Sequence, residues 1–174
     1  RSAGLRECHA LAAIRARQLS QPVSLGRLQP ASTPLIDKLV ADGILQHVRK
    51  GHTVRFSHDI FFEWSFFHVL LERDNKWLEE IRQCGEPPAV ARVVELLSQW
   101  EYREGKSWTG TLNLIAAAKM RSQWTRAWLL GPLGAATFRT NEAEFVNAVT
   151  ANGFDFLKKA LVWFQAEKTT PNAN

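Results

Sequence analysis

Apolar positions in the first part of the chain follow a helical spacing. From Leu5 to Leu19, apolar or small side chains recur every three or four residues, which predicts an α-helix. The segment SLGRLQ lies between Pro22 and Pro30 and is long enough for only a short helical turn. The stretch ASTPLIDKLVADGIL begins with capping residues and a proline, continues with an apolar face and contains a late glycine. This stretch is therefore predicted to form a second full helix.

The spacing then changes from helical to alternating. Ile44–Val48 and Thr53–Phe56 are predicted to form two β-strands, and the second of them alternates polar and apolar side chains. The residues between them include Gly51, which favours a tight hairpin turn. Three helical segments followed by a hairpin have the order of a winged-helix domain.

A nearly continuous apolar segment follows the hairpin. Ile60 to Leu71 should form a helix that is buried on most faces, sandwiched between the winged helix and the rest of the chain. The rest is predicted to be helical, with helices near Lys76–Cys84, Pro88–Arg103, Gly110–Met120, Ser122–Leu130, Asn141–Asn152 and Phe154–Lys168. Short helices with short connections favour antiparallel pairs stacked into an α-solenoid of the HEAT or TPR kind. We therefore expect a mainly α protein with a winged-helix domain over residues 1–72 and a helical solenoid segment over residues 73–174.

Composition limits the class of protein. The 174 residues are 45% apolar and 22% charged, with a formal net charge of +5, and no apolar run approaches the length of a membrane span. We expect a soluble, cytoplasmic protein without a membrane partner. Cys8 and Cys84 lie far apart and lack metal-site spacing, so neither a disulfide framework nor a metal site is expected. The sequence shows no signal-peptide pattern and resembles a piece of a longer polypeptide.

The junction between the last strand and the apolar helix reads Phe56-Ser57-His58-Asp59. Ser57 is expected to cap the helix, with His58 and Asp59 in its first turn. The start of a helix offers backbone N–H groups and the positive end of a dipole, which favour a bound anion such as phosphate. An imidazole at this place can add one directed hydrogen bond.

This junction also carries a family resemblance. The winged-helix order, the phrase LIDKLVADGIL and a strand running into F-S-H-D before an apolar helix resemble the regulatory half of STAND signalling NTPases, the group of NACHT and NB-ARC ATPases. The resemblance implies that His58 contacts the β-phosphate of ADP in the intact protein and that Asp59 supports the local structure. Ser57 stands where the eukaryotic motif has Met, which suits the looser F-x-H-D pattern of bacterial members. The resemblance covers roughly the first 72 residues, and the helical remainder is similar to the solenoid regions of such proteins.

No catalytic motif occurs in the chain itself. A Walker A pattern, a strand ending in paired acids, a G-x-S-x-G elbow and an H-E-x-x-H pair are all missing from the sequence. We therefore expect a regulatory and scaffolding part of an ATP-dependent signalling protein, such as one in prokaryotic antiviral defence, rather than an enzyme. ADP or ATP would be bound only in the intact protein, with an upstream ATPase domain as the first partner. A protein ligand or a second copy would bind the helical region.

Two other functions remain open. The first is a winged-helix DNA-binding regulator with a helical dimerisation region. Its hairpin would supply Arg49, Lys50 and Arg55, but the preceding helix carries Asp37 and Asp42, which repel phosphate and disfavour sequence-specific DNA binding. The second is a helical adaptor that binds peptide or protein.

The tryptophans bear on the adaptor alternative. The chain has seven, most of which should lie in the core. Trp124 and Trp128 lie four residues apart on one helical face and are predicted to form a groove wall or a contact with the next repeat.

Overall fold

The computed structural model describes residues 3–18, 22–28 and 32–168. The chain forms two compact units, residues 1–93 and 94–174. The first unit contains the segment predicted as a winged-helix domain and continues through further helical elements to residue 93, and the domain boundary at residue 72 stays a prediction. No helix in the described ranges is both long enough and apolar enough to cross a membrane.

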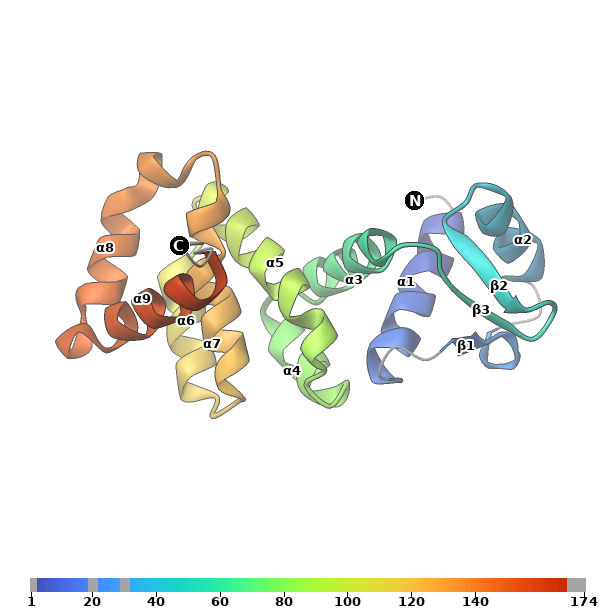
Figure 1. Cartoon of the computed structure of the whole chain (residues 1–174), viewed down its shortest axis with the longest axis horizontal. Helices are drawn as coiled ribbons and strands as arrows, with labels where there is room; N and C mark the ends of the chain where they lie inside the picture. Colours follow the sequence, from blue (N-terminus) through green and yellow to red (C-terminus); the bar gives the residue numbers. More distant parts are fainter. Residues whose placement is uncertain (1–2, 19–21, 29–31, 169–174) are drawn as a thin grey trace, which may run out of the picture. The chain divides into compact units, whose positions relative to one another are not determined.

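The first unit combines helices with a small sheet (Figure 1). Its elements are α1 (Ala3–Arg17), β1 (Val23–Ser24), the 3₁₀-helix η1 (Leu25–Arg27), α2 (Thr33–Ala41), β2 (Leu45–Arg49), β3 (Thr53–Phe56), α3 (Asp59–Arg73), η3 (Asp74–Lys76), α4 (Trp77–Gln83) and η4 (Pro88–Val90). The predicted first helix extended to Leu19, which lies outside the described residues.

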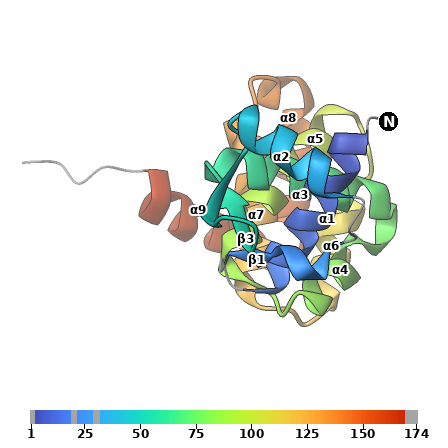
Figure 2. The ribbon, with the colours of Figure 1, turned by 90° about the vertical axis from the view of Figure 1, so that its right-hand side faces the viewer.

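The sheet contains the predicted hairpin and one strand that the sequence pattern missed. Its order is β1-β3-β2, with both pairs antiparallel and Val23 opposite Val54. Val23, Val54 and Leu45 are all buried, so the three strands share one inner face. α1 packs against both α2 and β1 (Figure 2). β1 has only two residues, too few to show alternation, and it forms because Val23 completes the inner face of the sheet.

The expectation that the apolar helix is buried on most faces is wrong. In α3, Phe62, Phe66 and Leu70 are buried, and the helix packs on α1 and α4 (Figure 1). Ile60 is 66% exposed and Trp64 is 53% exposed. Composition predicted burial, but α1 and α4 cover only part of the helix circumference. The side of α3 that bears Ile60 and Trp64 therefore faces solvent.

The second unit is helical. α5 (Ala91–Arg103) leads into it from the first unit, and it continues with α6 (Trp108–Ala117), α7 (Ser122–Leu130), η5 (Pro132–Gly134), η6 (Phe138–Asn141), α8 (Glu142–Thr150), η7 (Asn152–Phe154) and α9 (Asp155–Lys168). The predicted bounds of α7 are confirmed, and α6 begins two residues earlier than expected. α7 packs against both α6 and α9. The solenoid assignment stays a prediction.

Tryptophan side chains build the core of this unit. Trp108, Trp124 and Trp128 are fully buried. The prediction that Trp124 and Trp128 form a groove wall is therefore wrong, because the face of α7 that they share is turned into the core, and the alternative of a contact with the next repeat stays a prediction. Trp77 is buried in the first unit, so four of the seven tryptophans are core residues, as expected for the majority.

A hydrogen-bond network joins α5, α6 and α7 inside this core. The Trp108 Nε1–H donates to Ser98 Oγ at 2.8 Å, and the Ser98 hydroxyl donates to the Trp128 carbonyl oxygen at 2.6 Å. The Trp128 Nε1–H donates to the Trp108 carbonyl oxygen at 3.2 Å. Each polar group of this buried set therefore has a partner.

Candidate functional site

The start of α3 differs in one respect from the prediction. The N-cap residue is His58, with φ −137° and ψ 149°, and the helix begins at Asp59. Ser57 does not cap the helix. Its backbone N–H donates to the Ile44 carbonyl oxygen at 3.0 Å, so Ser57 is still bound in the manner of a strand residue.

The Ser57 side chain is held by the turn that precedes β2. Its hydroxyl lies 2.5 Å from the Gly43 carbonyl oxygen and 3.1 Å from the Ile44 carbonyl oxygen, and it donates to them. These contacts hold the Ser57 side chain at the strand end, and the N-cap position of α3 falls one residue later, at His58. His58 consequently follows a rigid residue, and its exposed imidazole lies beside the first turn of α3.

A cleft of about 390 Å³ in the first unit contains all three predicted site residues. We call it the His58 cleft. Apolar side chains from α1 and the sheet line its inner part, and its polar lining residues are Arg15, Gln46, Arg55, Ser57, His58 and Asp59. The structure therefore brings the F-S-H-D junction together with two arginines from other elements.

Arg15 is a half-buried, firmly held cation in the cleft. Its side chain is 14% exposed, and Nη2 lies 2.6 Å from Asp59 Oδ1. The guanidinium stacks over the Phe62 ring at 4.2 Å from the ring centroid. An ion pair and a cation–π contact thus join α1 to the start of α3.

Arg55 is the second cation and is exposed. With the Gln46 amide oriented so that its oxygen faces Arg55, Oε1 accepts hydrogen bonds from Nε at 2.8 Å and from Nη2 at 3.2 Å. Gln46 and Arg55 are opposite each other in the β2–β3 register. This cross-strand pair holds the Arg55 guanidinium beside the cleft. Because Gln46 is neutral, its hydrogen bonds leave the positive charge of Arg55 unchanged.

These groups suit an anion rather than a metal or a catalytic step. Asp59 already pairs with Arg15, so Arg55 provides a further positive charge, and His58 and the start of α3 add hydrogen-bond donors. Across the part of the chain that the structure describes, no group of three or more His, Cys, Asp or Glu is placed to hold a metal ion. The cleft therefore presents groups of the kind that bind phosphate or carboxylate.

Sequence reasoning missed Arg15 entirely and assigned Arg55 to the hairpin surface. One signal was available for Arg15, because it lies one helical turn after Leu11, an apolar lining residue of the same cleft. No local pattern could show that this turn of α1 would meet Asp59, which lies 44 residues later.

A second polar cluster joins α1 to α3 away from the cleft. His9 Nδ1 lies 3.3 Å from Glu72 Oε1, and the His9 ring stacks on His68 with centroids 5.7 Å apart. The Trp64 ring meets the edge of His68 at 4.2 Å. The two contacts of His9 join α1 to α3, whereas the contact of Trp64 with His68 lies within α3.

Glu80 is the most deeply buried carboxylate described in this unit, at 4% exposure. Its Oε1 pairs with Arg17 at 2.9 Å and its Oε2 with Arg73 at 3.2 Å, which links α1, α3 and α4. The neighbouring thiol of Cys84 is buried, and this burial raises its pKa above the ordinary value. The cluster is a structural ion network whose carboxylate is fully occupied.

The second unit has a shallow groove of about 420 Å³. Its lining residues come from α6, from α8 and from the residue that follows α8; they are Thr109, Asn113, Glu144, Asn147, Ala148 and Ala151. The Thr109 hydroxyl lies 3.1 Å from Glu144 Oε1, to which it donates. Exposed carboxamides of Asn113 and Asn147 flank a floor of small side chains.

Comparison with known proteins gives no match for this chain among family models, curated proteins or solved structures.

Proposed function

We propose that this chain is a regulatory part of a STAND-type signalling ATPase, in which the His58 cleft receives the phosphates of a nucleotide held by an ATPase domain. The observation that carries the proposal is the lining of one cleft by Ser57, His58 and Asp59 together with two arginines. This grouping supports the F-S-H-D resemblance, because a chance match of four letters does not require an anion-binding environment.

The cleft suits a sensor rather than a complete nucleotide site. It offers cations and a helix start, which are groups for phosphate. The sequence has no glycine-rich phosphate loop, so the base, the ribose and most phosphate contacts belong to another domain. The exposed Ile60 and Trp64, one turn apart on α3 and close in sequence to His58, provide an apolar surface on which that domain would dock.

The Arg15–Asp59 pair offers a way to transmit nucleotide state. A phosphate that enters the cleft competes with the Asp59 carboxylate for the Arg15 guanidinium. Because this ion pair joins α1 to α3, a change in the bound nucleotide would alter the contact between the two helices. Local competition for a charge is a recognised means of driving a larger conformational change.

The test is the substitution His58→Ala in the intact ATPase that carries this chain. Loss of one hydrogen bond to a charged phosphate corresponds to about 1.5–3 kcal/mol, so ADP affinity should fall roughly 10- to 100-fold. His52→Ala is the matched control, since His52 is an exposed histidine of the same hairpin that does not line the cleft. Unchanged ADP retention and basal activity in His58→Ala would contradict the sensor role, and so would the absence of a Walker A loop in the upstream sequence.

A second candidate function is that of a helical protein-binding adaptor, and the groove of the second unit favours it. The carboxamides of Asn113 and Asn147 can pair with a peptide backbone, and Glu144 favours a basic side chain in the ligand. If the upstream sequence lacks a Walker A loop, this candidate is preferred. Retention of a copurifying protein that is lost in Asn147→Ala, but kept in His58→Ala, would support it, and equal retention in both variants would count against it.

A further inference from the structure

The three strands and η1 lie in two stretches of sequence without a single acidic residue. Arg17–Ile36 and Gly43–His58 contain no Asp or Glu. In the hairpin turn, Arg49, Lys50 and His52 are exposed. Most basic surface residues of proteins have carboxylates nearby, whereas this surface receives none from its own elements.

The fold adds a fourth basic residue to the hairpin turn. The Leu25 backbone N–H donates to the His52 carbonyl oxygen at 2.8 Å, which places η1 against the turn. The exposed Arg27 at the end of η1 therefore lies on the same part of the unit as the turn residues. We call Arg27, Arg49, Lys50 and His52 the wing surface.

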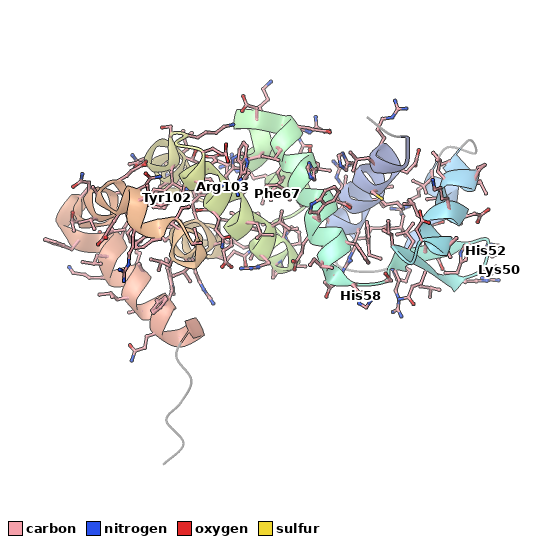
Figure 3. All side chains as sticks on the ribbon, turned by 90° about the horizontal axis from the view of Figure 1, so that it is seen from above. Lys50, His52, His58, Phe67, Tyr102 and Arg103 are labelled. Carbon is pink, nitrogen blue, oxygen red and sulfur yellow. The ribbon has the colours of Figure 1, made fainter. Side chains whose placement is uncertain are left out.

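The wing surface is separate from the His58 cleft. Figure 3 shows Lys50 and His52 at the outer end of the hairpin and His58 beyond the opposite end of β3. None of the four wing residues lines the cleft. An inference about the wing surface therefore does not rest on the proposed nucleotide sensor.

Backbone hydrogen bonds hold the turn in one conformation. The His52 N–H donates to the Arg49 carbonyl oxygen at 2.9 Å, and the Arg49 N–H donates to Thr53 Oγ1 at 3.1 Å. Gly51 has φ +72°, a conformation that other residues adopt with difficulty. Because the backbone is already ordered, a ligand would need to immobilise only side chains.

The acidic residues around the hairpin lie away from the turn, and Asp59, seven residues after His52, is at the start of α3 and pairs with Arg15. Asp42 is the C-cap of α2 and precedes β2, so the length of that strand separates it from the turn. Asp37 lies within α2. These two carboxylates disfavour phosphate beside α2 but leave the outer end of the hairpin positive.

The chemistry of the wing surface favours nucleic acid over two other polyanionic partners. Stable membrane binding needs apolar insertion in addition to charge, and Val48 is the one exposed large apolar side chain beside the described turn residues. Hot spots of protein interfaces are aromatic residues and arginines packed in fitted pockets, whereas Arg27 and Arg49 are exposed and this surface has no aromatic anchor beside them except His52. A nucleic-acid backbone requires only cations and hydrogen-bond donors.

We infer that the wing surface binds the phosphate backbone of duplex DNA without reading its sequence. A two-stranded antiparallel ribbon fits the major groove, which is about 12 Å wide. Asp37 and Asp42 keep α2 from the bases, so the contact is limited to the hairpin and η1. This role differs from a sequence-specific regulator, in which the helix would supply the base contacts.

The expected affinity follows from the charge. With three formal cations at phosphates, the slope of log K against log salt is about −2.7, which corresponds to roughly a 40-fold loss of affinity from 50 to 200 mM salt. The dissociation constant should lie in the range of about 10⁻⁴ to 10⁻⁶ M that is typical of non-specific binding.

The test uses the 174-residue chain and a fluorescein-labelled duplex of roughly 20 base pairs, about two helical turns, with anisotropy as the readout. The double variant Arg49→Ala/Lys50→Ala should lose about 10-fold or more in affinity at low salt, and its salt slope should fall by about 2. The control Lys158→Ala/Lys159→Ala removes the same charge from exposed positions of α9 and should bind as the wild type does. All four positions are exposed, so circular dichroism should show an unchanged fold.

Several results would overturn the inference. Absence of binding by the wild type at low salt would do so, as would equal losses in the two double variants. A preference of more than roughly 10-fold between unrelated duplexes would exclude a backbone-only contact. Two competing polyanions are tested beside the duplex: vesicles that contain phosphatidylglycerol, and free polyglutamate. Tighter binding of either competitor than of the duplex would assign the surface to a different partner.

Discussion

Ser98→Ala tests the hydrogen-bond network in the core of the second unit. Ser98 is fully buried, and its hydroxyl both accepts from Trp108 Nε1–H and donates to the Trp128 carbonyl oxygen. Within a helix, that carbonyl would normally accept from the N–H four residues later. The residue there is Pro132, which has no N–H. The Ser98 hydroxyl therefore supplies a donor that the backbone cannot.

The magnitude follows from the two groups that lose their partners. A buried donor or acceptor left unsatisfied costs about 1–3 kcal/mol, so two such groups lower the free energy of unfolding by about 2–6 kcal/mol. With a urea m-value of about 1.5 kcal/mol/M, a loss of 3 kcal/mol moves the midpoint by roughly 2 M. A change of this size is well above the scatter of exposed substitutions, which is about 0.5 kcal/mol.

The assay is urea unfolding followed by tryptophan fluorescence. Five of the seven tryptophans lie in residues 94–174, so the signal reports mainly on the second unit. Ser122→Ala is the matched control, because Ser122 is exposed at the first residue of α7. If Ser98→Ala and Ser122→Ala had the same midpoint with unchanged m-values, the network would contribute nothing measurable and the reasoning would be refuted.

Two further predictions concern the same unit. Gly131→Ala should lower the free energy of unfolding by about 1–3 kcal/mol, because the added Cβ would lie 2.7 Å from the Glu95 carbonyl oxygen and from Ser98 Cβ. Its control in thermal unfolding is Gly26→Ala, which would meet only Ser24 Oγ at 3.7 Å, and equal melting points for the two variants would contradict the steric argument. Burial, followed by the charges of Glu144 and Glu142, raises the pKa of Tyr102 to about 12. This folded-state pKa lies above the unfolded value of about 10, so the neutral Tyr102 phenol contributes fully to the free energy of unfolding below pH 10. This contribution, about 3 kcal/mol, is lost as pH rises from about 10 to 12. Urea unfolding over this pH range should show that loss in the wild type but not in Tyr102→Phe. Tyr102 is the only tyrosine, so phenolate absorbance reports on it alone and should give the same pKa. Parallel profiles of unfolding free energy against pH for the two proteins would contradict the assignment.

Local pattern predicted the secondary structure well where one element carries its own signals. Thr33–Ala41 has a proline near its start and is followed by Gly43 at φ +73°, and both signals are local. The hairpin likewise follows from two short strand-like segments on either side of Gly51. β1 was missed because its pairing with β3 depends on residues 30 positions away.

The candidate site was predicted only in part. His58 and Asp59 were located correctly at the start of the apolar helix, since a strand that ends before a helix identifies that boundary. The role expected of Ser57 was wrong because strand pairing extends to Ser57, whose N–H donates to the Ile44 carbonyl oxygen, and α3 begins one residue later than the pattern indicated. A capping preference is local, whereas this extension of the strand pairing exists only in the folded sheet.

The sequence by itself determined the mainly helical class, the hairpin and the position of the F-S-H-D junction, because helix periodicity, strand alternation and turn residues act over a few neighbouring positions. The tertiary structure alone decided which faces are covered and which side chains meet. It turned Trp124 and Trp128 into the core, left Ile60 and Trp64 exposed on α3, and joined Arg15 to Asp59. The physical reason is that burial and ion pairing depend on which elements pack together, and contacts between residues far apart in the chain have no signature in local spacing.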